Sequence, residues 1–255
     1  MPDGLQTTAS IARGLEILRA FASDQEWLGN QELAELTGLP KSTISRATNT
    51  LVAAGFLESG EGQQKFRLGP AVLLLAGRVT GLEALRVALR PELQAVASGF
   101  GVSVGAAHVD REDIVYFEYR RSSAPVSLSL SVGSRVPILN TAAGSAILAL
   151  SSAGERELIF TTAAERGGRP ATDALQRQVA QAEDEYHRDG YCRSFGTWHA
   201  EVNAIAVPYR VPASGLLTAL TAAGPPYSVS KEHLEKEVAP GLHKLIRTLD
   251  SRYGR

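Results

Sequence analysis

A run of ten residues near the start of the chain, 41–50, concentrates side chains of the types that bind nucleic acid. It combines two cations with hydroxyls and an amide and has no acidic residue: Lys41, Ser42, Thr43, Ser45, Arg46, Asn49 and Thr50. Hydroxyls and short amides are weak helix formers, but they bond well to phosphate oxygens and base edges. A face covered only by water would usually carry Glu, Lys and Gln. The run therefore predicts a surface that contacts DNA.

The same run has the periodicity of an amphipathic helix. At about 100° per residue, the less polar residues fall on one side. These residues are Ile44, Ala47, Thr48 and Leu51. Ser42, Arg46 and Asn49 fall opposite them, flanked by Thr43, Ser45 and Thr50. One side can therefore pack against the protein while the other enters a major groove.

Two helices are expected before this one. Spacings of four, three and three predict a first helix with an inner face of Ile11, Leu15, Leu18 and Phe21. A second helix is predicted over 31–37, with Leu33 and Leu36 inward.

The ends of the second helix complete a recognisable motif. Asn30 is the expected N-cap and a further candidate for DNA contact, while Gly38 ends the helix. Pro40 suits the start of the next helix, because its missing N–H needs no partner there. Helix, glycine-containing turn and helix together predict a helix-turn-helix unit.

A β-hairpin is predicted after the helix-turn-helix. Residues 59–62 read Ser-Gly-Glu-Gly, a turn signal, and 63–68 form the returning strand. Alternation places Phe66 and Leu68 toward the core and leaves Lys65 and Arg67 for the phosphate backbone. A solvated hairpin with two chance cations is the alternative interpretation.

The charge balance limits how this surface can work. The chain has 26 Lys and Arg against 27 Asp and Glu, and residues 1–70 have six against eight. No global field draws the molecule to nucleic acid, so any DNA contact must be local. We expect modest affinity for a monomer and binding of a homo-oligomer, a dimer or tetramer, to two half-sites.

Several segments together resemble the IclR family of bacterial transcription regulators. They follow the family's order along nearly the whole chain: 12–18 (ARGLEIL), 32–34 (ELA), 37–43 (TGLPKST), 66–69 (FRLG), 132–137 (VGSRVP), 141–144 (TAAG) and 203–208 (NAIAVP). The resemblance implies a mixed α+β protein. A winged helix-turn-helix would occupy 1–70, a linker helix 71–90, and a GAF/PAS-like α/β effector-binding domain 91–255.

The family's function would follow from the same resemblance. It implies a sequence-specific regulator, not an enzyme, that binds double-stranded operator DNA. A small-molecule effector, a carboxylate or aromatic acid of a catabolic pathway, would control it. Within the linker, residues 70–89 would also help the DNA-binding modules to dimerise.

Apolar periodicity predicts how the linker and the effector domain are built. Residues 79–96 form a helical stripe in which Pro91 begins a second segment, and its simpler interpretation is core packing. Strands are predicted over 102–106, 114–119, 126–132, 202–207 and 216–222. Helices are predicted over 142–150, 155–160 and 173–189, and from Ser230 onward with a bend at Pro240. This order predicts an antiparallel sheet with helices on its faces.

The effector site is assigned by the resemblance. It implies a cleft between the sheet, the 133–144 segment and the stretch after Gly190-Tyr191. The backbone N–H groups of Ala142 and Ala143, after Thr141, would meet a small carboxylate, because a helix N-terminus favours an anion. Taken alone, these three residues read as a packed helix start.

Two departures from the family suggest a larger effector. Ser194 stands where some members have an acidic residue, and Ala204 stands where a cysteine can occur. The intervening 195–199 segment, Phe-Gly-Thr-Trp-His, adds two aromatic rings and an imidazole. We expect stacking plus one polar anchor, with Thr197, His199 or Asn203 as candidates. An exposed loop with His199 in water is the alternative.

Other chemistries find little support in the sequence. The five histidines lack metal-ligand spacing, and no nucleophile elbow or phosphate-binding glycine loop occurs, so we expect no metal or cofactor. The lone Cys192 excludes an intrachain disulfide, and no run is long enough to span a membrane. We expect a soluble cytoplasmic protein. An enzyme with an unrecognised site and a ligand-independent architectural DNA binder remain the alternatives.

Overall fold

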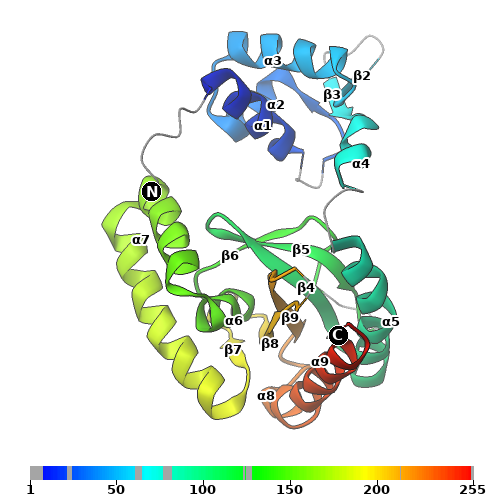
Figure 1. The fold of residues 1–255 in the computed structure, drawn as a ribbon, viewed down its shortest axis with the longest axis vertical. Helices are drawn as coiled ribbons and strands as arrows, with labels where there is room; N and C mark the ends of the chain where they lie inside the picture. Colours follow the sequence, from blue (N-terminus) through cyan, green and yellow to red (C-terminus); the bar gives the residue numbers. More distant parts are fainter. Residues whose placement is uncertain are drawn as a thin grey trace. The chain divides into compact units, whose positions relative to one another are not determined.

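A computed structural model describes residues 8–21, 25–60, 65–76, 82–122, 124, 128–212 and 214–253. The chain divides into two units, Met1–Thr80 and Gly81–Arg255 (Figure 1).

The N-terminal unit is built on three helices, α1 (Ala9–Ala20), α2 (Asn30–Thr37) and α3 (Lys41–Ala53). Gly38 ends α2 with a φ of 70°, a conformation that glycine adopts without strain. The helix-turn-helix is thus confirmed. A small core joins the three helices to the strands: Ile17, Phe21, Leu28, Leu33, Ile44, Leu57 and Phe66.

A three-stranded sheet and a short helix complete this unit. The strands β1 (Leu28–Gly29), β2 (Leu57–Ser59) and β3 (Lys65–Leu68) pair antiparallel in the order β1-β3-β2. Strands β2 and β3 form the expected wing, and its turn at 61–64 lies outside the described residues. Helix α4 (Ala71–Ala76) follows.

Four side chains in this unit were predicted to face the core but are exposed. Ile11 and Leu15 are 64% and 55% exposed, because α1 turns Ile17 and Phe21 toward the core instead. Leu36 is 56% exposed, because Leu33 and Ala34 are the residues of α2 that pack into the core. Leu68 is 41% exposed, so on β3 only Phe66 is buried.

The C-terminal unit begins with α5 (Leu82–Phe100), a helix of 19 residues that contains Pro91. The expected new start at Pro91 is therefore wrong. Proline removes the donor for the carbonyl of Val87, but Val87 is 57% exposed, so water can replace that donor. Of the predicted linker helix 71–90, residues 77–81 lie outside the described residues.

A six-stranded antiparallel sheet forms the centre of the C-terminal unit. The strands are β4 (Ser103–Asp110), β5 (Asp113–Arg120), β6 (Arg135–Pro137), β7 (Cys192–Phe195), β8 (Asn203–Arg210) and β9 (Leu217–Gly224). They lie in the order β6-β5-β4-β9-β8-β7. The expected antiparallel sheet with helices on its faces is confirmed (Figure 1).

The predicted strand over 126–132 is wrong for its described part. Residues 128–131 form no strand, and residues 132–133 lie in a turn in which Gly133 has a φ of 91°. The N–H of Ser131 donates a hydrogen bond to the Ser134 hydroxyl, so it bonds to a side chain and not to the main chain of a neighbouring strand. The short strands β6 and β7 were not predicted.

Helices cover both faces of the sheet. One core contains α5 and the C-terminal helices, and a second contains α6 (Ala142–Leu150) and α7 (Ala153–Asp189). The predicted helices over 155–160 and 173–189 belong to the single helix α7. Thr161 and Thr162, in the expected gap, donate to carbonyls one turn earlier, as helical threonines do.

The last helical segment starts where it was predicted. Ser230 caps α8 (Lys231–His233), which runs through a π-helical turn, η1 (Leu234–Val238), into α9 (Ala239–Tyr253). The π turn ends just before Pro240, whose lack of an N–H disturbs regular α-helical bonding there. The predicted inner residues are all buried: Leu234, Val238, Leu242, Leu245 and Leu249.

Candidate DNA-contacting and ligand-binding sites

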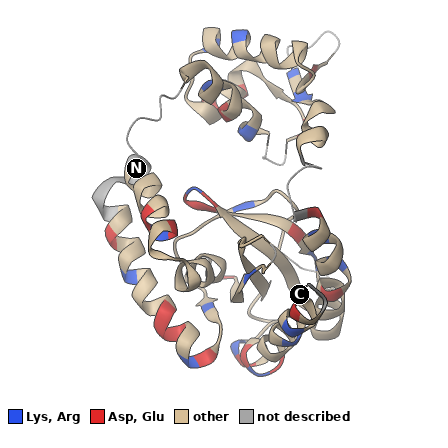
Figure 2. Ribbon diagram, viewed as in Figure 1, with Lys and Arg blue, Asp and Glu red and all other residues tan. Residues whose placement is uncertain are grey.

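Helix α3 separates a packed face from a polar face. Ile44 and Thr48 are fully buried, whereas Lys41, Arg46 and Asn49 are exposed. Ser42 and Thr50 are also exposed, and Thr43 and Ser45 are partly buried. Figure 2 shows basic but no acidic positions along α3. The arrangement suits an anionic ligand that approaches the polar face.

Two of the threonines on α3 bond to their own helix. Thr48 donates to the carbonyl of Ile44 at 3.0 Å, and Thr50 donates to that of Arg46 at 3.0 Å. Because its hydrogen is used in this bond, the Thr50 hydroxyl can only accept a hydrogen bond from a bound ligand. Within the described residues, Lys41 and Arg46 form no ion pair, so both cations are presented to solvent.

Residues from three elements meet beside the start of α3. An open depression of about 610 Å³ is lined by Lys41, Ser42 and Ser45 of α3, by Lys65 of β3, and by the 29–32 segment. Asn30 lies here, but it is the first residue of α2 and not its cap. Gly29 precedes the helix, and its N–H donates to a Glu32 carboxylate oxygen at 2.9 Å. The Asn30 Oδ1 is buried with no partner among the described residues.

Arg67 has other partners, although alternation put it on the same side of β3 as Lys65. Its guanidinium pairs with Glu58 at 2.8 Å and with Glu26 at 3.3 Å, and lies 4.9 Å from the centre of the Trp27 ring. These two carboxylates raise the pKa of Arg67. A phosphate would have to displace them, so the geometry argues against the predicted role of Arg67.

A small cavity lies where the sheet meets the start of α6. It encloses about 30 Å³ and is lined by Tyr116, Leu128, Leu130, Val136, Thr141, Ala142, Ala143, Ser194, Trp198, Val202, Ala204, Thr221 and Ala223. Five of the predicted effector residues thus come together. All of these lining residues are uncharged. Burial raises the pKa of Tyr116, so its phenol stays neutral.

The start of α6 is firmly held. Thr141 is the N-cap, and its hydroxyl accepts from the N–H of Gly144 at 3.1 Å. The Gln178 side chain bonds to the N–H of Asn140 and to the carbonyl of Ile138. Ala142 and Ala143 are the first two residues of the helix, where N–H groups have no partner within the helix. Their donors and the helix dipole favour an anion at this end.

The three predicted polar anchors do not line the cavity. Thr197 is exposed and donates to the carbonyl of Asn140 at 2.9 Å, as Ser194 does. His199 is exposed, with its ring 4.2 Å from that of Trp198. Asn203 is buried and donates to the carbonyl of Val229 at 3.0 Å. Thr197 and Asn203 therefore fasten the backbone, and His199 faces water.

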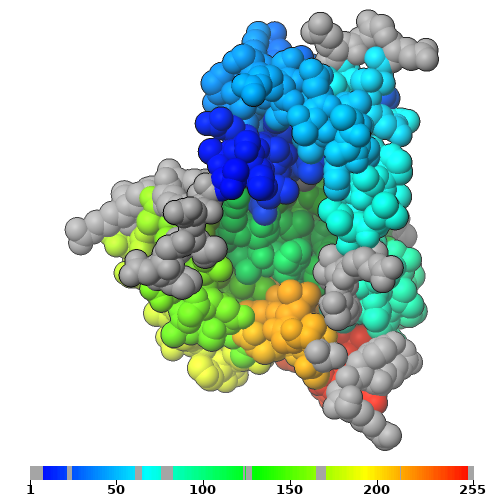
Figure 3. Space-filling view, turned by 45° about the horizontal axis from the view of Figure 1, so that its top comes forward, coloured from blue at the N-terminus to red at the C-terminus, as the bar shows by residue number. Residues whose placement is uncertain are grey.

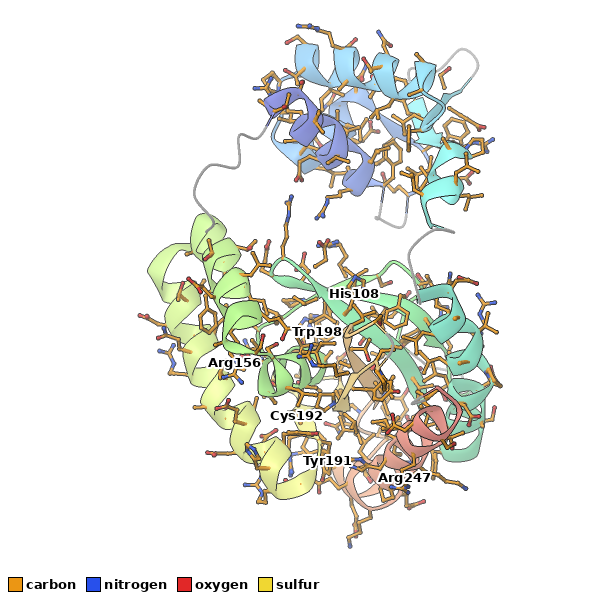
Figure 4. The ribbon with its side chains drawn as sticks, in the orientation of Figure 1. His108, Arg156, Tyr191, Cys192, Trp198 and Arg247 are labelled. Atoms are coloured by element: carbon orange, nitrogen blue, oxygen red, sulfur yellow. The ribbon has the colours of Figure 1, made fainter. Side chains whose placement is uncertain are left out.

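Sequence reasoning missed most of the apolar lining. Trp198 was included only as part of an aromatic loop, and it lies beside α6 and the sheet (Figure 4). The other missed residues are Tyr116, Leu128, Leu130, Val136, Val202, Thr221 and Ala223. Alternation marked several of them as inward, but only the sheet order brings them together.

Two negative findings apply to the described part of the chain. It contains no group of three or more His, Cys, Asp or Glu side chains arranged to hold a metal ion. None of its helices combines the length and apolar character that a bilayer span requires. Burial raises the pKa of Cys192 to about 12, so this thiol is unreactive in the folded protein.

Comparison with known proteins gives matches along the whole chain. The family model of the IclR helix-turn-helix domain matches residues 10–61, and that of the bacterial transcriptional regulator IclR C-terminal domain matches residues 78–251. The HTH-type transcriptional regulator TsaQ1/TsaQ2 of Comamonas testosteroni is 32% identical over 98% of this chain and 92% of its own length.

Solved structures agree in fold. An IclR family transcriptional regulator from Brucella abortus is 30% identical with a TM-score of 0.76, over 97% of this chain and 93% of its own. An IclR homologue from Microbacterium hydrocarbonoxydans, crystallised with 4-hydroxybenzoate, is 25% identical with a TM-score of 0.68. That match covers 94% of this chain and all of the other.

Proposed function

Because the chain belongs to the IclR family of bacterial transcriptional regulators, we propose that a small carboxylate effector controls its binding to operator DNA. Residues 1–70 would bind DNA, 71–90 would connect the two functions, and 91–255 would bind the effector. Leu85 and Leu89, in the second half of the connecting segment, are buried in the core that includes the sheet.

The polar face of α3 supports the assignment of the DNA contacts. Arg46 and Asn49 are exposed and suited to base edges, while Lys41 and Lys65 line one depression and suit phosphates. The other proposed contacts lie around these four residues: Asn30, Ser42, Thr43, Ser45 and Thr50. We assign Arg67 instead to stabilising the wing through its ion pairs with Glu58 and Glu26.

The class of effector follows from the cavity at the start of α6, the observation that carries the proposal. Apolar walls and a neutral phenol suit an aromatic ring, and the helix N-terminus suits a carboxylate. The complex of the Microbacterium homologue with 4-hydroxybenzoate agrees with this class.

Regulation would be allosteric, in a homo-oligomer that binds two half-sites. Few cations face DNA on one unit, so two linked units would be needed for tight binding. The effector would change the affinity for operator DNA, and operator DNA would change effector affinity by the same factor. The protein would work in the cytoplasm, where its DNA lies.

Selection of genomic fragments, followed by gel shift at fixed salt, tests the DNA half of the proposal. The wild type should enrich specific fragments, and Arg46→Ala should lose roughly 1–3 kcal/mol of sequence discrimination. Ala53→Ser, at an exposed position at the end of α3, is the matched control and should bind as the wild type does. Equal, weak and salt-sensitive binding by all three proteins would refute sequence-specific regulation.

Calorimetry with benzoate and 4-hydroxybenzoate tests the effector half. Binding should be lost in Ala142→Pro, which removes a donor at the first position of α6, where a helix tolerates proline. Operator affinity should then no longer respond to the ligand. Ligand binding that is unaffected by this change would place the carboxylate elsewhere.

A further inference from the structure

The cavity at the start of α6 is too small for the effector proposed above. It encloses about 30 Å³, room for roughly one or two water molecules. Pockets that hold organic ligands are on the order of 300–1,000 Å³. Some part of the lining must therefore move when a ligand enters.

The part of the lining at the start of α6 cannot move easily. A Cβ on Gly144 would lie 1.9 Å from the carbonyl oxygen of Ile138, so α6 already touches the preceding segment. Gln178 bonds to the main chain at Asn140 and Ile138 and to the Ser145 hydroxyl. This wall is fixed from both sides.

The lining on the sheet is fixed too. Ala204 on β8 and Thr221 and Ala223 on β9 lie in the interior of the sheet, where both strands are paired on both sides. Tyr116 on β5 packs edge-on against Tyr119, with ring centres 5.4 Å apart. Moving any of these residues would break a hydrogen-bonded ladder or a buried ring contact.

Trp198 differs from all of these residues. It lies between β7 and β8 on the 196–201 loop, which has no strand pairing of its own. The loop is closed at its base by the N–H of Gly196 donating to Val202 and is tied to Asn140 through Thr197. The indole is partly exposed, and its ring neighbour His199 is in water. Figure 4 shows the indole beside α6.

We propose that Trp198 determines which effectors fit: its indole fills the binding space in the free protein and swings out with the 196–201 loop. A single-ring carboxylate then takes the vacated space, with its ring against the indole and its carboxylate at the start of α6. In its displaced position the indole still bounds the space, so two-ring carboxylates do not fit. This inference rests on the proposed function, because it assumes that the cavity is the effector site.

Of the other lining residues outside regular structure, Thr141 caps α6 and Val202 is held by main-chain hydrogen bonds to Gly196 and His199. Leu128 and Leu130 are the remaining two. Both side chains are smaller than an indole, so a shift of either one vacates less space. Leu130 is also tied by its carbonyl to the side chain of Arg121 at 3.3 Å. Leu130→Ala is therefore a matched control that trims another part of the lining.

Calorimetry on the full-length protein with benzoate and 2-naphthoate tests the size limit. The wild type should prefer benzoate. Trp198→Ala should shift the ratio of the two affinities toward 2-naphthoate at least tenfold, whereas Leu130→Ala and His199→Ala should shift it less than threefold. Operator binding without ligand, together with circular dichroism, checks that each variant is folded.

Fluorescence tests the movement of the indole. The chain has two tryptophans, Trp27 and Trp198, and Trp27 belongs to the N-terminal unit. Benzoate should change the wild-type emission with the calorimetric affinity. Trp198→Phe should lose this change and keep an affinity within about fivefold.

The outcomes separate this inference from the function on which it rests. An unchanged affinity ratio in Trp198→Ala, with benzoate still bound by the wild type, overturns the role of Trp198 and leaves the effector site standing. If neither protein binds either carboxylate, the inference and the effector class both fail. Loss of binding in Ala142→Pro with an unchanged ratio in Trp198→Ala likewise rejects only the role of Trp198.

Discussion

Glu118 and Arg90 join strand β5 to helix α5 through an ion pair of 3.1 Å, in which the carboxylate side chain is only 2% exposed. Arg86 approaches the same carboxylate at 3.5 Å and Arg120 at 2.7 Å, so three guanidiniums share one buried anion. Two residues earlier, Tyr116 lines the cavity at the start of α6. The strand that forms one cavity wall is thus held directly to the helix that follows the connection between the units.

Neutralising this carboxylate should destabilise the protein. Glu118→Gln removes the buried charge that the three arginines share. We expect a loss of about 2–4 kcal/mol in unfolding free energy, since the arginines are partly exposed. Urea unfolding measures it. Glu83→Gln is the control, because Glu83 pairs with Arg86 at 3.0 Å but is 55% exposed, and it should cost less than about 1 kcal/mol. Equal losses would show that burial of Glu118 has no special effect.

The two cations of the wing should differ in their effect on DNA binding. Lys65→Ala removes a proposed phosphate contact and should make the slope of log K against log salt less steep by about 1 per bound unit. Arg67→Ala should leave that slope unchanged, because Glu58 and Glu26 already neutralise its guanidinium. Gel shifts from low to moderate salt measure both slopes. A clear drop in slope for Arg67→Ala would return this residue to the DNA surface.

Stability should depend on Glu155 in acid. Its pKa is lowered from 4.5 to about 2, mainly by its hydrogen bond with Arg210 and also by its bonds to Ser152 at the start of α7. A depressed pKa stabilises the folded state above the unfolded value, and the stabilisation is lost as pH falls through the folded value. The effect should be about 1 kcal/mol or less, because both side chains are more than a third exposed.

Glu155→Gln should reveal this effect. The difference in unfolding free energy between wild type and variant should be constant above pH 5 and should shrink as pH falls from about 4.5 toward 2. Urea titrations between pH 3 and pH 7 cover most of this range. A difference that does not change with pH would mean that Glu155 contributes through helix capping alone.

Gly105 should tolerate no side chain. A Cβ there would lie 2.7 Å from a Tyr116 ring carbon and 2.8 Å from one of Tyr119, both in a buried cluster. Gly105→Ala should cost about 1–3 kcal/mol and weaken effector binding, since Tyr116 lines the cavity. Gly99→Ala, where a Cβ meets nothing within 4 Å on α5, should be neutral or slightly stabilising. Thermal unfolding compares them, and equal melting temperatures would contradict the packing argument.

The sequence predicted the polar face of α3 well, because a helix of 3.6 residues per turn sorts its own residues. It did not predict which side of a broadly apolar helix packs. Ile11 and Leu15 therefore seemed internal, although they line a groove with α3 residues such as Leu51 and with Leu75 of α4. Helices α1 and α3 lie side by side on the surface of their unit (Figure 3). Which side of α1 is buried depends on the helices and strands that pack against it, and the periodicity of the helix itself does not identify them.

The partners of Arg67 and the walls of the cavity were missed for a related reason. Glu58 stands directly opposite Arg67 in the hairpin, so a register drawn from the turn could have found that pair. The cavity instead combines β5, α6, the 196–201 loop and β9, whose adjacency follows from the order of six strands. A single sequence gives the strands but not that order.

The register of β5 shifts against β4 between Ala106 and Ala107, so β5 has one more residue there than its neighbour. Phe117 packs into the core shared with α5, while Tyr116 and Tyr119 belong to the core of α6. For the gene, this means that an in-frame deletion of codon 117 would remove the bulge and restore simple alternation. Glu118 and both tyrosines would keep their present faces, whereas a codon inserted beside them would exchange the faces of all the residues that follow in the strand.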